Sequence, residues 1–174
     1  MAVQKLTKSI VTKFQDLKKK LLERSFSKMN ENQREAVFTV NGPVVVLAGA
    51  GSGKTTAIVN RIVNMINYGD AYTTDEIPEF LDESLVENLE NVYKNGEGAE
   101  SVKNIIKHNP IRPWNILAIT FTNKAAGELK NRLSNVLGDV GKDVYASTFH
   151  SLCSRILRAH AEKLGYSNHF VVYD

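Results

Sequence analysis

Cysteine, tryptophan and proline are scarce in this chain of 174 residues, which has one cysteine, one tryptophan and four prolines. Cys153 cannot form an internal disulfide alone, and none of the four histidines joins it at the spacing of zinc ligands. A disulfide framework and a cysteine-based zinc site are therefore excluded. We interpret Cys153 as a small buried residue on a helix.

Long apolar runs are also absent. No stretch approaches the roughly 20 apolar residues of a membrane span, and the lysine-containing N-terminus lacks the apolar core of a secretory signal. We therefore expect a cytoplasmic protein without a membrane partner. The hydrophobic content of 43% is sufficient for a buried core, and the length suits one domain with appendages.

Charge is unevenly distributed along the chain, although the net charge is only +3. Residues 70–107 contain ten acidic residues and three lysines, whereas the rest of the chain has 19 basic and nine acidic residues. A basic body with an acidic appendage is compatible with a nucleic-acid partner. A basic surface can also serve solubility alone, so charge does not decide the function.

A glycine-rich loop is the most informative motif. Residues 48–55 read Ala-Gly-Ala-Gly-Ser-Gly-Lys-Thr and lie between the apolar run 44–47 and a helical pattern, the context of a phosphate-binding P-loop. The glycines allow backbone N–H groups to surround an anion. Lys54 is expected to contact the β- and γ-phosphates of a nucleoside triphosphate, and Thr55 to ligate Mg²⁺. The predicted loop residues are Ala48, Gly49, Ala50, Gly51, Ser52, Gly53, Lys54 and Thr55.

Strand and helix patterns alternate after residue 43. Strands are predicted at 44–48, 115–121, 144–148 and 170–173, and helices at 54–68, 123–137 and 149–164. Continuous apolar strands separated by helices favour a parallel sheet that is covered on both faces. The predicted fold class is therefore α/β, a P-loop NTPase with a RecA-like parallel sheet and helices on both faces.

Two segments lie outside this alternation. Residues 1–25 form an amphipathic helical pattern with a lysine-rich outer face, which we expect to pack on the domain rather than to bind a partner or membrane. Residues 26–174 are interpreted as the first part of the ATP-binding domain, interrupted at about 70–113 by an acidic, mostly helical insertion. We expect the insertion to cap an edge, with partner binding as the alternative. A second helix is predicted after Asn30, because Gln33 has capping-box spacing.

Three further segments, together with the P-loop, resemble a known family. They are Met-Asn-Glu-Asn-Gln-Arg-Glu-Ala-Val at 29–37, Thr-Phe-Thr-Asn-Lys-Ala-Ala at 120–126 and Ser-Thr-Phe-His-Ser-Leu at 147–152. In this order the four segments resemble the Q motif and motifs I, Ia and Ib of UvrD/Rep-type superfamily one DNA helicases. The resemblance covers residues 26–68 and 111–174.

The resemblance implies ATP and Mg²⁺ as cofactors. Gln33 is similar to the family's adenine-selecting residue, and an amide side chain can both donate to and accept from the adenine edge. Helix capping is the alternative role and can coexist with it. Lys54 and Thr55 are the implied catalytic residues. Thr56 stands where many members have arginine, which leaves its predicted contact with ATP in doubt.

The resemblance also implies contacts with single-stranded DNA, whose bases stack on aromatic side chains. Exposed donors at a helix N-terminus suit the phosphate backbone. The alternatives are a plain N-cap for the group Thr122, Asn123 and Lys124, core positions for both phenylalanines and a structural role for His150. The predicted DNA-binding residues are Phe121, Thr122, Asn123, Lys124, Thr148, Phe149 and His150.

Hydrolysis of this type requires an acidic pair after a strand and arginines near the transferred phosphate. No Asp-Glu pair follows a predicted core strand, since Asp82-Glu83 lies in the insertion and Asp174 lacks a following glutamate. We therefore expect an N-terminal part of a larger helicase, whose remaining domains are its partners, without appreciable activity by itself. The alternatives are a naturally short nucleotide- or DNA-binding module and a small P-loop kinase, although residues 70–107 contain no arginine for a kinase lid.

Overall fold

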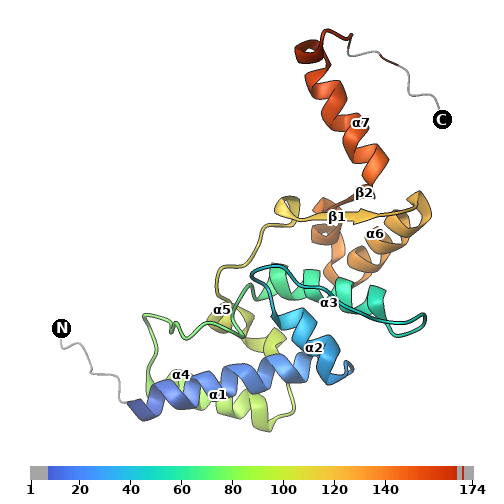
Figure 1. Cartoon of the computed structure of the whole chain (residues 1–174). Helices are drawn as coiled ribbons and strands as arrows, with labels where there is room; N and C mark the ends of the chain where they lie inside the picture. The colour runs from blue at the N-terminus through green and yellow to red at the C-terminus, as the bar shows by residue number, and fades with distance from the viewer. Residues whose placement is uncertain (1–7, 168–169, 171–174) are drawn as a thin grey trace. The chain divides into compact units, whose positions relative to one another are not determined.

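Figure 1 shows the computed structural model of the chain, which describes residues 8–167 and 170. The chain divides into two compact units, with the boundary between Ile111 and Arg112. No helix among the described residues is both long and apolar enough to cross a membrane.

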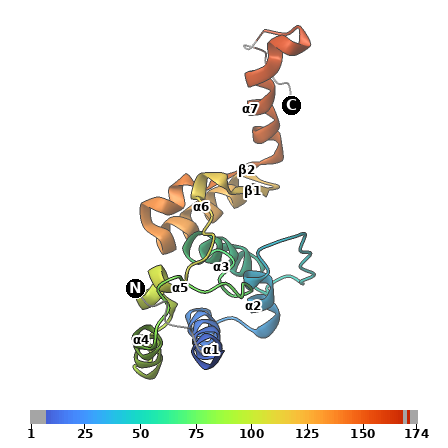
Figure 2. The ribbon, with the colours of Figure 1, turned by 90° about the vertical axis from the view of Figure 1, so that its left-hand side faces the viewer.

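The first unit is helical. It consists of α1 (Lys8–Ser25), α2 (Glu31–Phe38), α3 (Lys54–Asn67), α4 (Glu83–Lys94), a 3₁₀ turn η1 (Ala99–Val102) and α5 (Lys103–Ile106). Its core gathers apolar side chains from α1, α2, the ends of α3 and the insertion. Helices α1 and α4 lie side by side, as the end-on view in Figure 2 shows.

Helix α1 buries one apolar face, which includes Phe14, Leu17 and Leu21. The three- and four-residue spacing of these side chains places them on one side of a helix. Helix α2 begins with the predicted capping box. The backbone N–H of Gln33 donates to Asn30 Oδ1 at 2.9 Å, and the backbone N–H of Asn30 donates to Gln33 Oε1 at 3.1 Å, which confirms that prediction.

The insertion returns close to the point where it leaves. The Asp70 N–H donates to the His108 carbonyl at 3.0 Å, and the His108 N–H donates to the Tyr68 carbonyl at 3.0 Å. Gly69 lies at this junction with a φ of +64°, and a Cβ there would meet the His108 carbonyl oxygen. Only glycine can therefore occupy the place where the two ends of the insertion meet.

The predicted strand at 44–48 is wrong for this structure, because these residues form irregular backbone. Their side chains are exposed, up to 93% at Leu47. A strand is defined by a hydrogen-bonded neighbour, and no such neighbour is present for this segment among the described residues. Apolar character alone could not supply one.

The second unit contains the sheet. Its elements are a 3₁₀ turn η2 (Pro113–Asn115), β1 (Leu117–Thr120), α6 (Asn123–Leu137), a 3₁₀ turn η3 (Gly138–Asp143), β2 (Tyr145–Thr148), α7 (Phe149–His160) and a 3₁₀ turn η4 (Ala161–Leu164). Strands β1 and β2 pair in parallel, with Leu117 opposite Tyr145 and Thr120 opposite Thr148. Helix α6 has the predicted bounds, whereas α7 ends at His160 and is followed by η4.

This mixture of helices with a small parallel sheet is compatible with the predicted α/β class. Within the second unit α6 packs on both strands, but Leu117 and Ile119 remain about half exposed. The predicted cover on both faces is therefore not present in the described part of this unit. The predicted strand at 170–173 and Asp174 lie outside the described residues, apart from Phe170, which is not in a strand.

Candidate functional site

The P-loop lies directly before α3 in the first unit. Gly51 and Gly53 have φ values of +76° and +83°, in the left-handed region that favours glycine. Gly53 is the N-cap of α3, and a Cβ at Gly53 would lie 2.7 Å from Nε2 of Gln33. The loop thus ends at the start of a helix, where unpaired backbone N–H groups and the helix dipole favour the binding of an anion.

Lys54 folds over this loop. Its ammonium group donates to the carbonyl oxygens of Ala48 at 3.1 Å and Gly49 at 2.6 Å. The Ser52 hydroxyl donates to the same Gly49 carbonyl at 2.8 Å. These contacts hold a positive charge at the loop, where a phosphate oxygen could replace the carbonyl partners.

Gln33 connects α2 to the P-loop. Its Nε2 donates to the Ser52 carbonyl at 2.9 Å, while its Oε1 accepts the bond that caps α2. Both ends of the amide are therefore engaged, and an adenine edge would have to replace one of these bonds. The capping role that the sequence left open is present.

A cavity of about 300 Å³ joins these residues within the first unit. Of the predicted nucleotide-binding residues, those that line it are Gln33, Ala48, Gly49, Ser52, Gly53 and Lys54. Ala50, Gly51, Thr55 and Thr56 do not line it. The Thr56 carbonyl accepts a hydrogen bond from Asn60 Nδ2 at 2.9 Å.

Thr55 is exposed in the first turn of α3, beside Lys54. The structure shows no cluster of three or more His, Cys, Asp or Glu that could hold a metal among its described residues. Mg²⁺ usually keeps several waters and binds nucleotide phosphates with few protein ligands. One exposed hydroxyl beside the P-loop fits a magnesium ion that is held mainly by the nucleotide.

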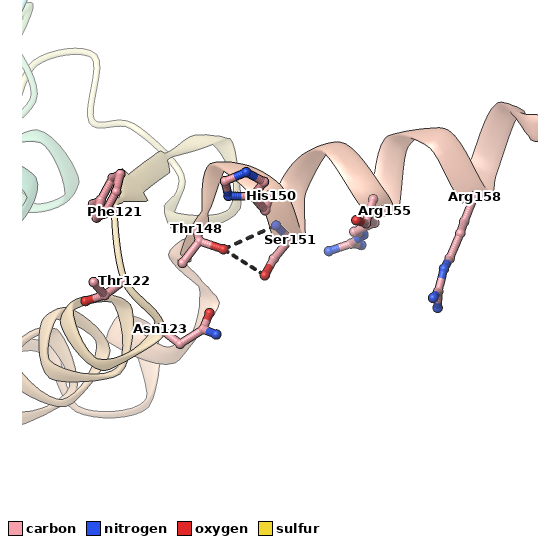
Figure 3. Close-up of a pocket in the computed structure, with 9 residues that line it drawn as sticks. Phe121, Thr122, Asn123, Thr148, His150, Ser151, Arg155 and Arg158 are labelled. Carbon is pink, nitrogen blue, oxygen red and sulfur yellow. Dashed lines mark hydrogen bonds between the residues drawn. The ribbon is translucent and has the colours of Figure 1, made fainter. Parts of the chain in front are cut away.

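The second unit brings the other two motifs to one edge of its sheet. Thr120 and Thr148 are paired in neighbouring parallel strands, and the chain continues from each strand into a helix. Carboxyl ends of parallel strands are a common place for ligand sites. A cavity of about 810 Å³ lies here, and Figure 3 shows the side chains around it.

Two threonines build this edge by capping the helices. Thr122 Oγ1 accepts from the Ala125 N–H at 3.1 Å, and Thr148 Oγ1 accepts from the Ser151 N–H at 3.2 Å. Phe121 is 94% exposed and Phe149 is 60% exposed, so neither occupies a core position here. An exposed aromatic ring is available for stacking.

The sequence analysis predicted only some of the residues that line this cavity. Five predicted DNA-binding residues line it, whereas Lys124 and Phe149 do not. Ser151, Ser154, Arg155 and Arg158 line it as well. Their spacing of three and four residues along α7 was the available signal. Figure 3 shows both arginines along this helix.

Arg155 also faces β2. Its guanidinium carbon lies 4.8 Å from the centre of the Tyr145 ring. Hydrogen bonding by Arg155 is the main cause that lowers the pKa of the Tyr145 phenol. Arg155 is thus placed between the sheet and the cavity, while Asp and Glu are absent from the cavity lining among the described residues.

A glycine-rich loop at a helix start and parallel strands that feed helices are compatible with an α/β helicase domain. The chain matches the family model for the UvrD/REP helicase N-terminal domain over residues 29–77 and 99–174, and it belongs to this family. The match leaves out residues 1–28 and 78–98.

Known relatives agree with this assignment. The chain is 38% identical over 148 residues to the ATP-dependent DNA helicase PcrA of Bacillus subtilis, covering 85% of this chain and 15% of the relative. It is 37% identical over 146 residues to PcrA of Staphylococcus aureus, covering 84% and 14%. The chain therefore spans about one seventh of the length of these relatives.

Proposed function

We propose that this chain is the ATP-binding portion of a DNA helicase, whose parent protein couples ATP hydrolysis to movement along single-stranded DNA and to duplex unwinding. The observation that carries the proposal is the position of Lys54, with its ammonium group on the carbonyls of the P-loop at the start of α3. Relatives named ATP-dependent DNA helicases support the reaction.

ATP and Mg²⁺ are the proposed cofactors. In this proposal the N–H groups of the P-loop surround the phosphates, Lys54 neutralises their charge and Thr55 ligates the metal. Bound Mg²⁺ would supply further charge neutralisation at the transferred phosphate. Gln33 would select adenine, exchanging its bond to the Ser52 carbonyl for one to the base.

Single-stranded DNA is the proposed ligand of the second unit. Two arginines and the start of α7 offer donors to phosphates, and Phe121 offers a face to a base. Lys124 and Phe149, which are exposed outside the cavity lining, remain proposed contacts on the same edge. Binding by such a site weakens as salt rises, because bound cations are released from DNA.

A RecA-like core is also part of the proposal, supported by the order P-loop, α3, β1, α6, β2 and α7. Neither cavity is lined by Asp or Glu among the described residues, and no arginine lines the P-loop cavity. We therefore propose that the remaining helicase domains of the parent chain supply the acidic pair and the arginines of hydrolysis.

The test is a titration of the 174-residue chain with Mg²⁺-ATP and with a labelled single-stranded oligonucleotide, separately and together. Loss of a charge-assisted contact costs about 1.5–3 kcal/mol, so Lys54→Ala should weaken ATP binding at least tenfold and leave DNA binding intact. Arg158→Ala should weaken DNA binding and leave ATP binding intact. Equal ATP affinity in Lys54→Ala and the unmodified chain would contradict the proposed nucleotide site.

A further inference from the structure

The two segments outside the family match pack against each other. Helix α1 lies within residues 1–28 and α4 within residues 78–98, and Figure 2 shows the two helices side by side. The Lys13 ammonium lies 2.8 Å from Glu90, and the Arg24 guanidinium carbon lies 3.9 Å from the centre of the Tyr93 ring. We call α1 together with residues 71–107 the accessory module; of these, residues 71–77 and 99–107 lie within the family match.

An aromatic stack joins the accessory module to α2, the helix of the Q motif. The Tyr72 ring lies parallel to the Phe38 ring, with 4.0 Å between centres and 5° between planes. The Phe26 ring lies nearly perpendicular to the Phe38 ring, with 5.5 Å between centres and 85° between planes. Phe38, the last residue of α2, therefore contacts one ring of the accessory module and one ring that directly follows α1.

Tyr72 is itself fixed by α1. Its hydroxyl donates to the Glu23 carboxylate at 2.6 Å. Burial, reinforced by this bond, raises the pKa of Tyr72 to about 12, so the hydroxyl keeps its proton at neutral pH. Tyr72 thus links the two parts of the accessory module to each other.

Helix α2 needs such support because it has only eight residues. Isolated helices shorter than about 12 residues are marginal in water. On its other side, α3 holds the same end of α2: Asn64 Nδ2 donates to the Val37 carbonyl at 3.2 Å, and Arg61 donates to the Ala36 carbonyl. Gln33 lies in the first turn of this short helix and reaches the P-loop from there.

We propose that Tyr72 is a positioning residue for the nucleotide site, through which the accessory module fixes α2 and holds Gln33 against the P-loop. The effect on adenine selection rests on the proposed role of Gln33, whereas the effect on α2 itself does not.

The first measurement is hydrogen exchange of the α2 amides in the full 174-residue chain without nucleotide. Tyr72→Ala removes the stack and should lower protection of α2 by about tenfold, the effect of losing roughly 1.4 kcal/mol of aromatic contact. Tyr72→Phe keeps the ring and should retain protection within about threefold, since it loses only the Glu23 bond. Tyr93→Ala is the matched control, because it damages the accessory module at Arg24, away from α2.

The second measurement is competition of ATP and GTP for a fluorescent ATP analogue. Tyr72→Ala should reduce the preference for ATP over GTP in the same direction as Gln33→Ala, while Tyr93→Ala should not. If α2 protection is unchanged in Tyr72→Ala, or falls equally in Tyr93→Ala, the positioning role is overturned. If Gln33→Ala leaves the nucleotide preference unchanged, the adenine-selecting role fails instead, and the exchange result still decides the role of Tyr72.

Discussion

Single glycines carry much of the P-loop geometry, and Gly53 is the most constrained. We predict that Gly53→Ala destabilises the chain by about 1–2 kcal/mol, the cost of a left-handed conformation for a residue with a Cβ. The new methyl group would also displace Gln33 Nε2, which lies 2.7 Å away from its position. Urea unfolding with tryptophan or circular dichroism detection would measure the change.

Gly49→Ala is the matched control for this experiment. Its backbone has no positive φ, and a Cβ there meets nothing within 4 Å. Its stability should change by less than about 0.5 kcal/mol. Equal losses in both variants would contradict the conformational argument for Gly53.

His108 predicts a pH dependence of stability. Its Nδ1 lies 2.5 Å from Asp70 and its Nε2 lies 2.9 Å from Glu76. The hydrogen bond to Asp70 is the main cause that raises the pKa of His108 above its ordinary value of 6.5. A raised folded-state pKa stabilises the protein fully below the unfolded pKa and loses this effect as pH rises through the folded value.

The measurement is urea unfolding of the unmodified chain and of His108→Gln between pH 5.5 and 9. We expect the unmodified chain to lose part of its stability advantage over the variant as pH rises above about 6.5. His108 is partly exposed, so the change should be modest. An advantage that stays constant across this range would show that the imidazolium contributes nothing.

At this scale the sequence predicted the cap by Gln33 and a glycine-rich loop before a helix, because both depend on local spacing. The contacts of these residues with a nucleotide stay predictions. The capping pair of Asn30 and Gln33 is separated by only three positions, so the sequence alone indicates it. Arg155 and Arg158 were missed because the family motif ends before them, although their helical spacing was visible. The contact of Tyr72 with Phe38 joins residues far apart in the chain, which no local pattern specifies.

Among the helices, the N-cap of α6 can be tested directly by substitution. Thr122→Ala removes the oxygen that accepts from the Ala125 N–H, and should cost about 1 kcal/mol of stability. Thr122→Ser retains the cap and should cost much less. Chemical unfolding of the two variants gives the comparison, and a similar loss in both would assign the effect to the lost methyl group rather than to the cap.

Helices were predicted more successfully than strands. The bounds 123–137 of α6 follow from an N-cap and a regular apolar face, both of which are local signals. The segment 44–48 has equally strong apolar character, yet it forms no strand because a strand depends on a neighbour. The two paired strands have such a neighbour in each other, aligned from Leu117 with Tyr145 to Thr120 with Thr148.

For the chain as a whole, we predict no appreciable ATP turnover. Neither cavity is lined by an Asp or Glu among the described residues, and hydrolysis of this type uses such a carboxylate to orient the attacking water. A coupled phosphate-release assay with saturating single-stranded DNA measures this, with Lys54→Ala as the background. Turnover clearly above that background would contradict the proposal that other domains complete the site.

The family could be inferred from four short motifs, and the comparisons confirm it. The α/β class was inferred from the alternation of strand and helix patterns. The division into two compact units could not be inferred, since it depends on contacts between distant residues. The acidic composition of residues 70–107 indicated a separate segment, but its packing partner, α1, was not specified by composition. Ion pairs such as Lys13 with Glu90 join two different helices, so they can be identified only once the packing of these helices is known.

The meeting of Gly69 and His108 has a consequence for how this chain could vary among its relatives. An insertion whose two ends meet can change in length without changing the backbone of the residues on either side of it. The family match breaks off at residue 77 and resumes at 99, inside this insertion and beyond Tyr72. Residues 78–98 therefore lie where a change in length leaves the local geometry of the glycine-rich loop and of the sheet unaffected.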